Sequence, residues 1–170
     1  MENKTRCAWC EKDDLYRNYH DNEWGKPVYD DETIFEFLIL ETFQAGLSWY
    51  TVLAKRENFR KAFDNFDLTK IANYSEDKMD ALAEDAGIIR NKLKIKATVT
   101  NAQAFIKVQE EFGSFSKYIW GFVDGKPIDN KPKTLNEVKA TTPISDALSK
   151  DLKKRGFKFV GSTVMYAHMQ

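Results

Sequence analysis

The chain has 170 residues, enough for one domain, residues 1–170, with a sizeable hydrophobic core. Hydrophobic residues make up 42% of it and aromatic residues 14%, which excludes an intrinsically disordered protein. No apolar run approaches the roughly 20 residues that a membrane-spanning helix needs, and the first six residues lack the apolar segment of a signal peptide. We therefore expect a cytoplasmic protein that makes no membrane contact.

The formal net charge is zero, with 26 basic and 26 acidic residues, so the total charge does not indicate a nucleic-acid-binding protein. The distribution is less even. Residues 86–100 hold four basic residues and no acid, and residues 148–160 hold five basic residues and one acid. A single run of this kind is usually the solvated face of a helix. Two such runs in a neutral chain leave room for a local phosphate-binding face.

The segment after residue 30 predicts a helix that carries an unusual acid. Residues 30–32 are acidic, which favours the start of a helix, and Gly46 is expected to end it. The spacing places a carboxylate on the same face as apolar residues: Ile34, Leu38, Glu41 and Ala45.

Further helices follow at short intervals. Ser48 is expected to cap a helix that continues to Phe63, and Ser75 caps another that Gly87 ends. Between them, residues 67–74 suit a short helix.

The second half of the chain contains the longest predicted helix, about residues 91–112, and a short aromatic helix over residues 115–122. The polar stretch 123–141 contains two prolines and is predicted to be a surface loop. Thr142 and Pro143 suit the N-cap and first position of a helix that ends at residue 154 or 155. Strand signals are poor throughout, so the predicted fold class is all-α.

The C-terminal basic run contains a turn bounded by Gly156 and Gly161, between two predicted helices. Backbone N–H groups in such a turn, together with the dipole of the second helix, bind a phosphate without side-chain charge. The alternative is an ordinary connection between two helices.

Glu41 and a group of aromatic residues are the candidates for chemistry. A carboxylate on an apolar helix face is paired, protonated or directed into a cavity. Stacking rings beside such a carboxylate would suit a flat, cationic ligand. The structural alternatives are an ion pair for Glu41 and a core role for the rings. The aromatic candidates lie in the first fifty positions: Trp9, Tyr16, Tyr19, Trp24, Trp49 and Tyr50.

The chain has two cysteines, Cys7 and Cys10, and two histidines, His20 and His168. Two cysteines do not make a disulfide framework. A zinc site needs four ligands as a rule, and one Cys-x-x-Cys pair is a weak signal for it. Free cysteines are more often plain hydrophobic residues.

Long segments in this order resemble the bacterial 3-methyladenine-DNA glycosylase I family, and the resemblance extends over nearly the whole chain. The segments are Cys7–Trp9, Tyr19–Gly25, Leu40–Glu41, Gln44–Trp49, Asp85–Arg90, Ser145–Ser149 and Lys153–Gly161. The resemblance implies the helix-hairpin-helix DNA glycosylase fold, a helical bundle whose N-terminal and C-terminal lobes flank a DNA-binding cleft. Residues 1–33 would be the N-terminal lobe, 34–122 the core, and 142–170 the helix-hairpin-helix unit.

The resemblance also implies an activity and its residues. The enzyme would hydrolyse the N-glycosidic bond of 3-methyladenine in double-stranded DNA and release the free base. We expect a monomer. Glu41 would be the catalytic residue that hydrogen-bonds the base. The base pocket would be formed by Tyr19, Trp49, Trp9 and Trp24. DNA contacts would come from Gly46, Leu47, Gly156, Phe157, Lys158, Phe159, Val160, Gly161 and Ser162. Ser162 and Thr163 stand where related lyases have a lysine, so a monofunctional enzyme is expected.

A structural zinc ion is the cofactor that the resemblance implies. Cys7 and His20 would supply half of its ligands, and the family takes the other two from a C-terminal tail. This sequence ends at Gln170, inside the predicted second helix of the hairpin unit, so we expect a truncated chain with a half site. Cys10 and His168 do not match ligand positions of the family.

Two other functions remain open from the residues alone. A non-catalytic helix-hairpin-helix DNA-binding module would need the hairpin and the basic runs, but neither Glu41 nor the aromatic group. A small metal-binding or scaffold protein would depend on Cys7, Cys10 and His20. Release of a base from alkylated DNA separates the enzyme from both.

Overall fold

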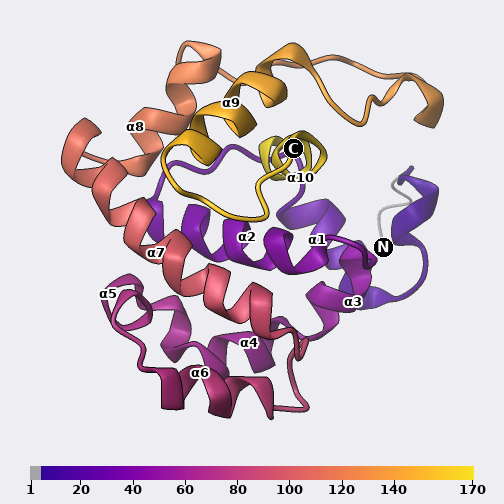
Figure 1. Ribbon diagram of the computed structural model, residues 1–170. Helices are drawn as coiled ribbons and strands as arrows, with labels where there is room; N and C mark the ends of the chain where they lie inside the picture. The colour runs from indigo at the N-terminus through magenta and orange to yellow at the C-terminus, as the bar shows by residue number, and fades with distance from the viewer. Residues whose placement is uncertain (1–4) are drawn as a thin grey trace.

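The computed structural model describes residues 5–170, and that range contains helices and no strand (Figure 1). The all-α fold class is therefore confirmed. None of the helices in this range is long and apolar enough to cross a bilayer. The α-helices are α1 Asp14–Asn22, α2 Asp31–Gln44, α3 Trp49–Ala54, α4 Arg56–Ala62, α5 Leu68–Ala72, α6 Glu76–Ala83, α7 Lys92–Phe112, α8 Phe115–Trp120, α9 Pro143–Lys154 and α10 Ser162–Met169. Four short 3-10 helices are η1 Ala8–Cys10, η2 Asp64–Phe66, η3 Gly121–Val123 and η4 Leu135–Glu137.

Helix α2 lies at the centre of the molecule, and the long α7 crosses it (Figure 1). The helices α5 and α6 pack on one half of α7, and α8 packs at its other end. Helix α10 packs against both α2 and α9. This arrangement brings the C-terminal helix against the helix that carries Glu41.

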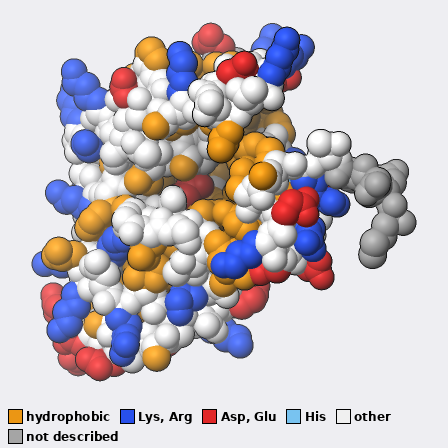
Figure 2. Space-filling view, turned by 90° about the vertical axis from the view of Figure 1, so that its right-hand side faces the viewer, with side chains coloured by type: hydrophobic (Ala, Val, Ile, Leu, Met, Phe, Trp, Pro, Cys, Tyr) orange, Lys and Arg blue, Asp and Glu red, His pale blue; other side chains and the backbone are white. Residues whose placement is uncertain are grey.

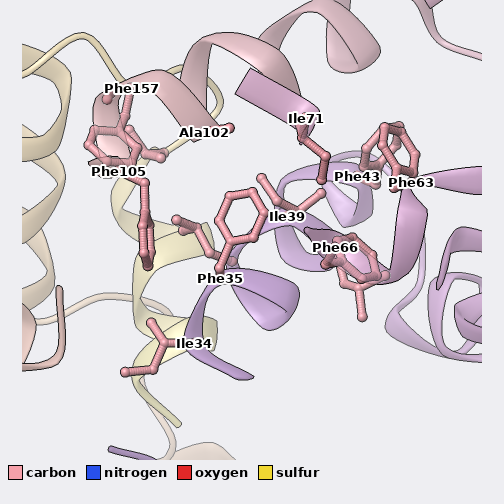
Figure 3. Close-up of a cluster of buried hydrophobic side chains, with 14 of the residues drawn as sticks. Ile34, Phe35, Ile39, Phe43, Phe63, Phe66, Ile71, Ala102, Phe105 and Phe157 are labelled. Carbon is pink, nitrogen blue, oxygen red and sulfur yellow. The ribbon is translucent and has the colours of Figure 1, made fainter. Parts of the chain in front are cut away.

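The core is rich in phenylalanine, and Figure 3 shows how its rings gather around α2. Phe35 packs edge-on against Phe105 of α7, with ring centroids 5.1 Å apart. On the other side, Phe43 meets Phe59 of α4 at 4.9 Å. Burying rings of this size contributes about 1.5–3 kcal/mol each. Because α2 is buried on several sides, the position of Glu41 is fixed by the packing of the whole core.

The helix starts follow the sequence signals closely. Asp30, Ser48 and Ser75 each accept a hydrogen bond from a backbone N–H in the first turn of the helix that follows. Thr142 and Ser145 form a reciprocal capping box at the start of α9. The predicted starts of these helices are confirmed.

Several boundaries differ from the predictions. The helix expected from Ser48 to Phe63 is two helices, α3 and α4, with a break at Lys55. Helix α6 ends at Ala83, four residues before Gly87, because the chain turns through residues 84–90. Helix α1 was not predicted. It is short and mostly polar, and it begins at the side-chain cap of Asp13.

Candidate active site

Glu41 is buried in the middle of the molecule and has one side-chain partner in the described chain, His168 of α10. The imidazole Nδ1 lies 2.5 Å from Oε2 of Glu41. Burial raises the pKa of the Glu41 carboxyl group, and the contact with His168 acts in the opposite direction. The face shared with Ile34 and Leu38 is thus confirmed as a buried face that includes a carboxylate.

The aromatic residues expected to line a base pocket lie together in the structure. The ring of Trp9 is 5.3 Å from that of Trp24 and 6.3 Å from that of Tyr19, measured between centroids. Tyr19 in turn lies 5.5 Å from Trp49 of α3. Burial and the nearby charge of Glu41 raise the pKa of the Tyr19 phenol. The four rings and the Glu41 carboxylate therefore lie close together, although they come from η1, α1, the turn after α1, α2 and α3.

The indole N–H of Trp49 is buried and has no hydrogen-bond partner among residues 5–170. A buried donor without an acceptor costs about 1–3 kcal/mol. Trp49 packs against Phe37 and Tyr19, whose ring faces offer no strong acceptor. A buried donor of this kind calls for a partner, and a bound ligand would supply one.

A hollow opens on the face of the molecule seen in Figure 2. Hydrophobic side chains surround it, and an acidic side chain is recessed at its base. Lysine and arginine side chains are spread around the edges of the same face (Figure 2). A recessed negative charge within an apolar hollow suits a flat ligand that carries positive charge.

The turn after α2 is fixed by a buried lysine. Lys94 of α7 donates from Nζ to the carbonyl oxygens of Phe43, at 2.8 Å, and Ala45, at 2.6 Å. These carbonyls lie at the C-terminus of α2, where the helix dipole is negative. Gly46 follows with φ +80°, and Leu47 has 41% of its surface exposed. Lys94 is therefore not available for the surface phosphate face that its basic run suggested.

The segment from Gly156 to Gly161 joins α9 to α10 and runs back along α9. Gly156 has φ +94°, a conformation that favours glycine. Ser149 of α9 donates its hydroxyl to the carbonyl of Val160 at 2.6 Å. Phe157 and Val160 are buried, and the Phe157 N–H donates to the carbonyl of Leu152 at 3.0 Å, so these two residues fasten the connection to the core. Lys158, Phe159 and the start of α10 remain on the outer side.

Gly161 and Ser162 lie where this segment enters α10. Gly161 is the N-cap and supplies no side-chain hydrogen bond to the first turn of the helix. The hydroxyl of Ser162 pairs with Ser145 at 2.8 Å and donates to Asp146 at 2.5 Å, which fastens α10 to α9. Backbone N–H groups of the first turn therefore have no side-chain acceptor.

Asn101 of α7 fixes the middle of this connection. Its side-chain oxygen accepts a hydrogen bond from the backbone N–H of Lys158 at 2.7 Å, and its side-chain nitrogen donates to the carbonyl of the same residue at 3.0 Å. Asn101 is fully buried. The Asn101 amide thus pairs with both backbone groups of Lys158, in a segment that is neither helix nor strand.

The structure brings the segments of the predicted metal ligands Cys7 and His20 together: Arg6, next to Cys7, pairs with Asp21 at 2.8 Å, and the Trp9 ring lies 5.2 Å from the His20 ring. The His20 ring stacks on Trp24, and its Nδ1 is 3.0 Å from a carboxylate oxygen of Asp21. Cys7 is exposed. No group of three or more His, Cys, Asp and Glu residues within 5–170 is arranged to hold a metal ion. The described residues therefore do not form a complete zinc site.

Sequence reasoning missed three buried polar residues that define this region: His168, Lys94 and Asn101. The sequence around His168 does not indicate its contact, because the residue it meets is 127 positions away in the chain. A signal did exist for Lys94 and Asn101, because both occur at positions where the periodicity of the long helix calls for apolar residues. Each of the three makes hydrogen bonds that compensate for its burial.

Comparisons with known proteins agree on one family. A sequence model described as methyladenine glycosylase matches residues 9–170. The chain is 49% identical over 165 residues to the DNA-3-methyladenine glycosylase 1 of Escherichia coli (strain K12), which covers 97% of this chain and 88% of that protein.

Solved structures give the same result. A crystal structure of 3-methyladenine DNA glycosylase I superposes with a TM-score of 0.95 at 48% identity, covering 98% of this chain and 91% of that one. A variant of 3-methyladenine DNA glycosylase I in complex with 3-methyladenine superposes with a TM-score of 0.93 at 38% identity, covering 97% and 89%. With the family's sequence pattern over nearly its whole length and the family's fold, this chain belongs to the methyladenine glycosylases.

Proposed function

We propose that this protein is a DNA-3-methyladenine glycosylase, which hydrolyses the N-glycosidic bond of 3-methyladenine in alkylated DNA. The observation that carries the proposal is the buried Glu41 carboxylate beside the ring of Tyr19. The names of the relatives support the reaction. A solved complex of a related protein with 3-methyladenine supports the free base as a ligand.

The chemistry of the damaged base explains why a carboxylate and aromatic rings are sufficient. Methylation at N3 gives the adenine in DNA a positive charge, which weakens its bond to the sugar. In the reaction, the bond between C1′ and N9 breaks, and both its electrons go to the base, which leaves as neutral 3-methyladenine. A water molecule forms the new bond to C1′ and loses a proton to solvent, leaving an abasic site.

Glu41 supplies the negative charge that distinguishes the cationic base from ordinary adenine. Burial strengthens this effect, because a charge pair is attracted more strongly where water is excluded. The hydrogen bond from His168 favours the ionised carboxylate against the cost of burial. A bound cation favours the ionised form of Glu41 further.

The four rings of the base pocket are assigned to stacking. Trp9, Tyr19, Trp24 and Trp49 form a continuous group in contact with one another. A base turned out of the duplex loses its stacking on its neighbours, and aromatic side chains restore part of it. Their electron-rich faces also attract a cation.

Contacts to DNA are assigned to two segments. Leu47 is exposed at the turn that Gly46 begins, and this exposure supports assigning it to the gap left by the extruded nucleotide. The connection from Gly156 to Ser162 is the candidate helix-hairpin-helix element. It would bind phosphates through the backbone and the N-terminus of α10, with Lys158 adding charge. The cleft would then lie between the N-terminal segment and this C-terminal unit. We further propose that the enzyme acts as a monomer.

Zinc has no part in these steps. Cys7 and His20 stay predicted as two ligands of a structural zinc ion, and the described residues supply no third. No step of the reaction needs a metal, because the leaving base is already activated by its methyl group.

The test is base release from a duplex that carries 3-methyladenine at known sites, with the free base measured by chromatography. We expect release by the wild type and a loss of at least a hundredfold in Glu41→Gln, which keeps the size of the side chain and removes its charge. Glu110→Gln, an exposed acid on α7 far from the site in sequence, is the matched control and should release the base normally.

Two outcomes would count against the enzyme. A folded wild-type protein that binds duplex DNA and releases no base would favour the non-catalytic DNA-binding module instead. Equal release by Glu41→Gln and the wild type would remove Glu41 from the reaction.

A further inference from the structure

His168 stands in the last turn of α10, and its imidazole is buried against the carboxylate of Glu41. The His168 and Glu41 side chains are 6% and 8% exposed, respectively. The proposed function gives Glu41 a role at the base and gives His168 only the stabilisation of that charge. A buried histidine whose side-chain partner is the key carboxylate calls for an explanation.

The direction of the hydrogen bond follows from the charge of Glu41. An ionised carboxylate has acceptors only, so the proton between the two groups is carried by Nδ1 of His168. The donor meets Oε2, which leaves Oε1 without a side-chain donor. A glutamate has three side-chain torsions, and one fixed oxygen removes most of this freedom before a substrate arrives.

The imidazole is held on a fixed support. Met165, one turn earlier in α10, is fully buried in the core. The backbone carbonyl of Gln170 accepts a hydrogen bond from the N–H of Gly25 at 3.1 Å, which ties the end of the helix to the segment after α1. Ser162 ties its start to α9. His168 is therefore held from both ends of an eight-residue helix.

We propose that His168 is a positioning residue, which donates from Nδ1 to Oε2 of Glu41 and so directs the other carboxylate oxygen toward the methylated base. The proposal rests on the proposed function. His168 touches neither the base nor the bond that breaks, and it acts through Glu41 alone.

The kinetic test compares two substitutions that affect packing and hydrogen bonding differently. His168→Phe keeps an aromatic ring of similar shape and removes the donor. His168→Asn loses the ring and keeps a donor, because the amide nitrogen stands the same number of bonds from the backbone as Nδ1. We expect His168→Phe to lower kcat/KM for base release by roughly tenfold to a hundredfold, the usual effect of losing a hydrogen bond to a charged group.

His168→Asn should recover most of that loss, to within about threefold of the wild type. A purely structural role predicts the reverse order, since asparagine leaves the larger gap. If His168→Phe and the wild type release the base equally, or if His168→Asn is the worse of the two, the proposal is wrong and the proposed function stands. If the wild type releases no base, the proposed function fails and the role of His168 fails with it.

A spectroscopic test needs no substrate. The chain has two histidines, so protein labelled with nitrogen-15 in histidine gives signals from His20 and His168 alone. His168→Phe assigns them. We expect the His168 Nδ1 to show a proton in a strong hydrogen bond, and Glu41→Ala to remove this signature while the His20 signals stay in place. A His168 signal that does not respond to Glu41→Ala would overturn the contact itself.

Discussion

Asn101, in the middle of α7, makes both of its side-chain hydrogen bonds to the backbone of a single residue, Lys158. The backbone N–H and the carbonyl of Lys158 are thus both paired with the side-chain amide of Asn101. The segment it holds is the connection proposed to bind DNA phosphates, so a residue inside the core determines the shape of a surface element.

Asn101→Ala should loosen this connection without unfolding the protein. It leaves one buried N–H and one carbonyl without partners, which costs about 1–3 kcal/mol of unfolding free energy. Affinity for a duplex with an abasic site should fall together with stability. Gln103→Ala, which removes a hydrogen bond from the same helix to Ala72, is the control and should leave DNA affinity unchanged. Equal DNA affinity in all three proteins would contradict the link between Asn101 and the binding surface.

Lys94→Met tests the turn that carries Leu47. The substitution keeps an unbranched side chain and leaves the carbonyls of Phe43 and Ala45 without their donor. We expect a loss of about 1–3 kcal/mol in urea unfolding and a slower single-turnover rate of base release. Lys96→Met removes an exposed lysine from the same helix and should leave the unfolding midpoint unchanged. A Lys94→Met protein as stable as this control would show that the two hydrogen bonds contribute nothing.

Trp49→Phe tests the indole N–H that lacks a partner. Phenylalanine keeps a stacking ring and removes the donor, so stability should not fall by the amount expected for a lost hydrogen bond. Affinity for free 3-methyladenine should fall by about threefold to tenfold, because a ligand nitrogen no longer finds a donor there. Calorimetry of base binding and thermal unfolding give the two quantities. Unchanged affinity would show that the N–H faces away from the ligand.

The pH dependence of base release should reflect Glu41. Burial raises the pKa of its carboxyl group, so it takes up a proton at a higher pH than an exposed glutamate. The ionised form attracts the cationic base, and kcat/KM should therefore fall as the pH is lowered below neutral. Glu41→Gln has nothing to titrate at this position, and its residual rate should be flat over the same range. An acid limb that persists in Glu41→Gln would assign the dependence to another group.

The same raised pKa also affects stability. Ionisation of Glu41, which should favour base release, should lower the stability of the fold. The folded protein binds the proton of Glu41 more tightly than the unfolded chain does. Stability is therefore lost as the pH rises through the unfolded pKa, and the loss is complete above the folded pKa. Glu41→Gln should raise the thermal midpoint at neutral pH, by about 2–4 °C for each kcal/mol regained. A lower midpoint in Glu41→Gln would mean that the pair with His168 outweighs the cost of burial.

The helices could be predicted from the sequence because their signals are local. Asp30, Ser75 and Thr142 precede their helices directly, and each caps the first turn in the structure. The break at Lys55 was missed because the apolar pattern continues across it. Helix α1 has nine residues and is mostly polar, so it offers few apolar positions from which to predict a helix.

The candidate site could be predicted only in part. Glu41 is conspicuous because a carboxylate interrupts an apolar face, and that property is visible in a window of a dozen residues. Its partner His168 is not, because the contact depends on how α10 packs against α2. Asn101 and Lys158 are separated by 57 residues, and nothing local to either indicates the other. Pairings of this kind are properties of tertiary packing.

Helix α10 connects the segment proposed to bind DNA phosphates with the carboxylate proposed to bind the base. Ser162 begins it beside the connection proposed to bind phosphates, and His168 lies six residues later against Glu41. At 1.5 Å per residue, the helix sets a separation of about 9 Å along its axis between the two points. A helix of this length is stiff, so this separation stays constant. With the DNA backbone bound at one end as proposed, the distance from the bound phosphate to the Glu41 carboxylate is the same for every base that enters the pocket.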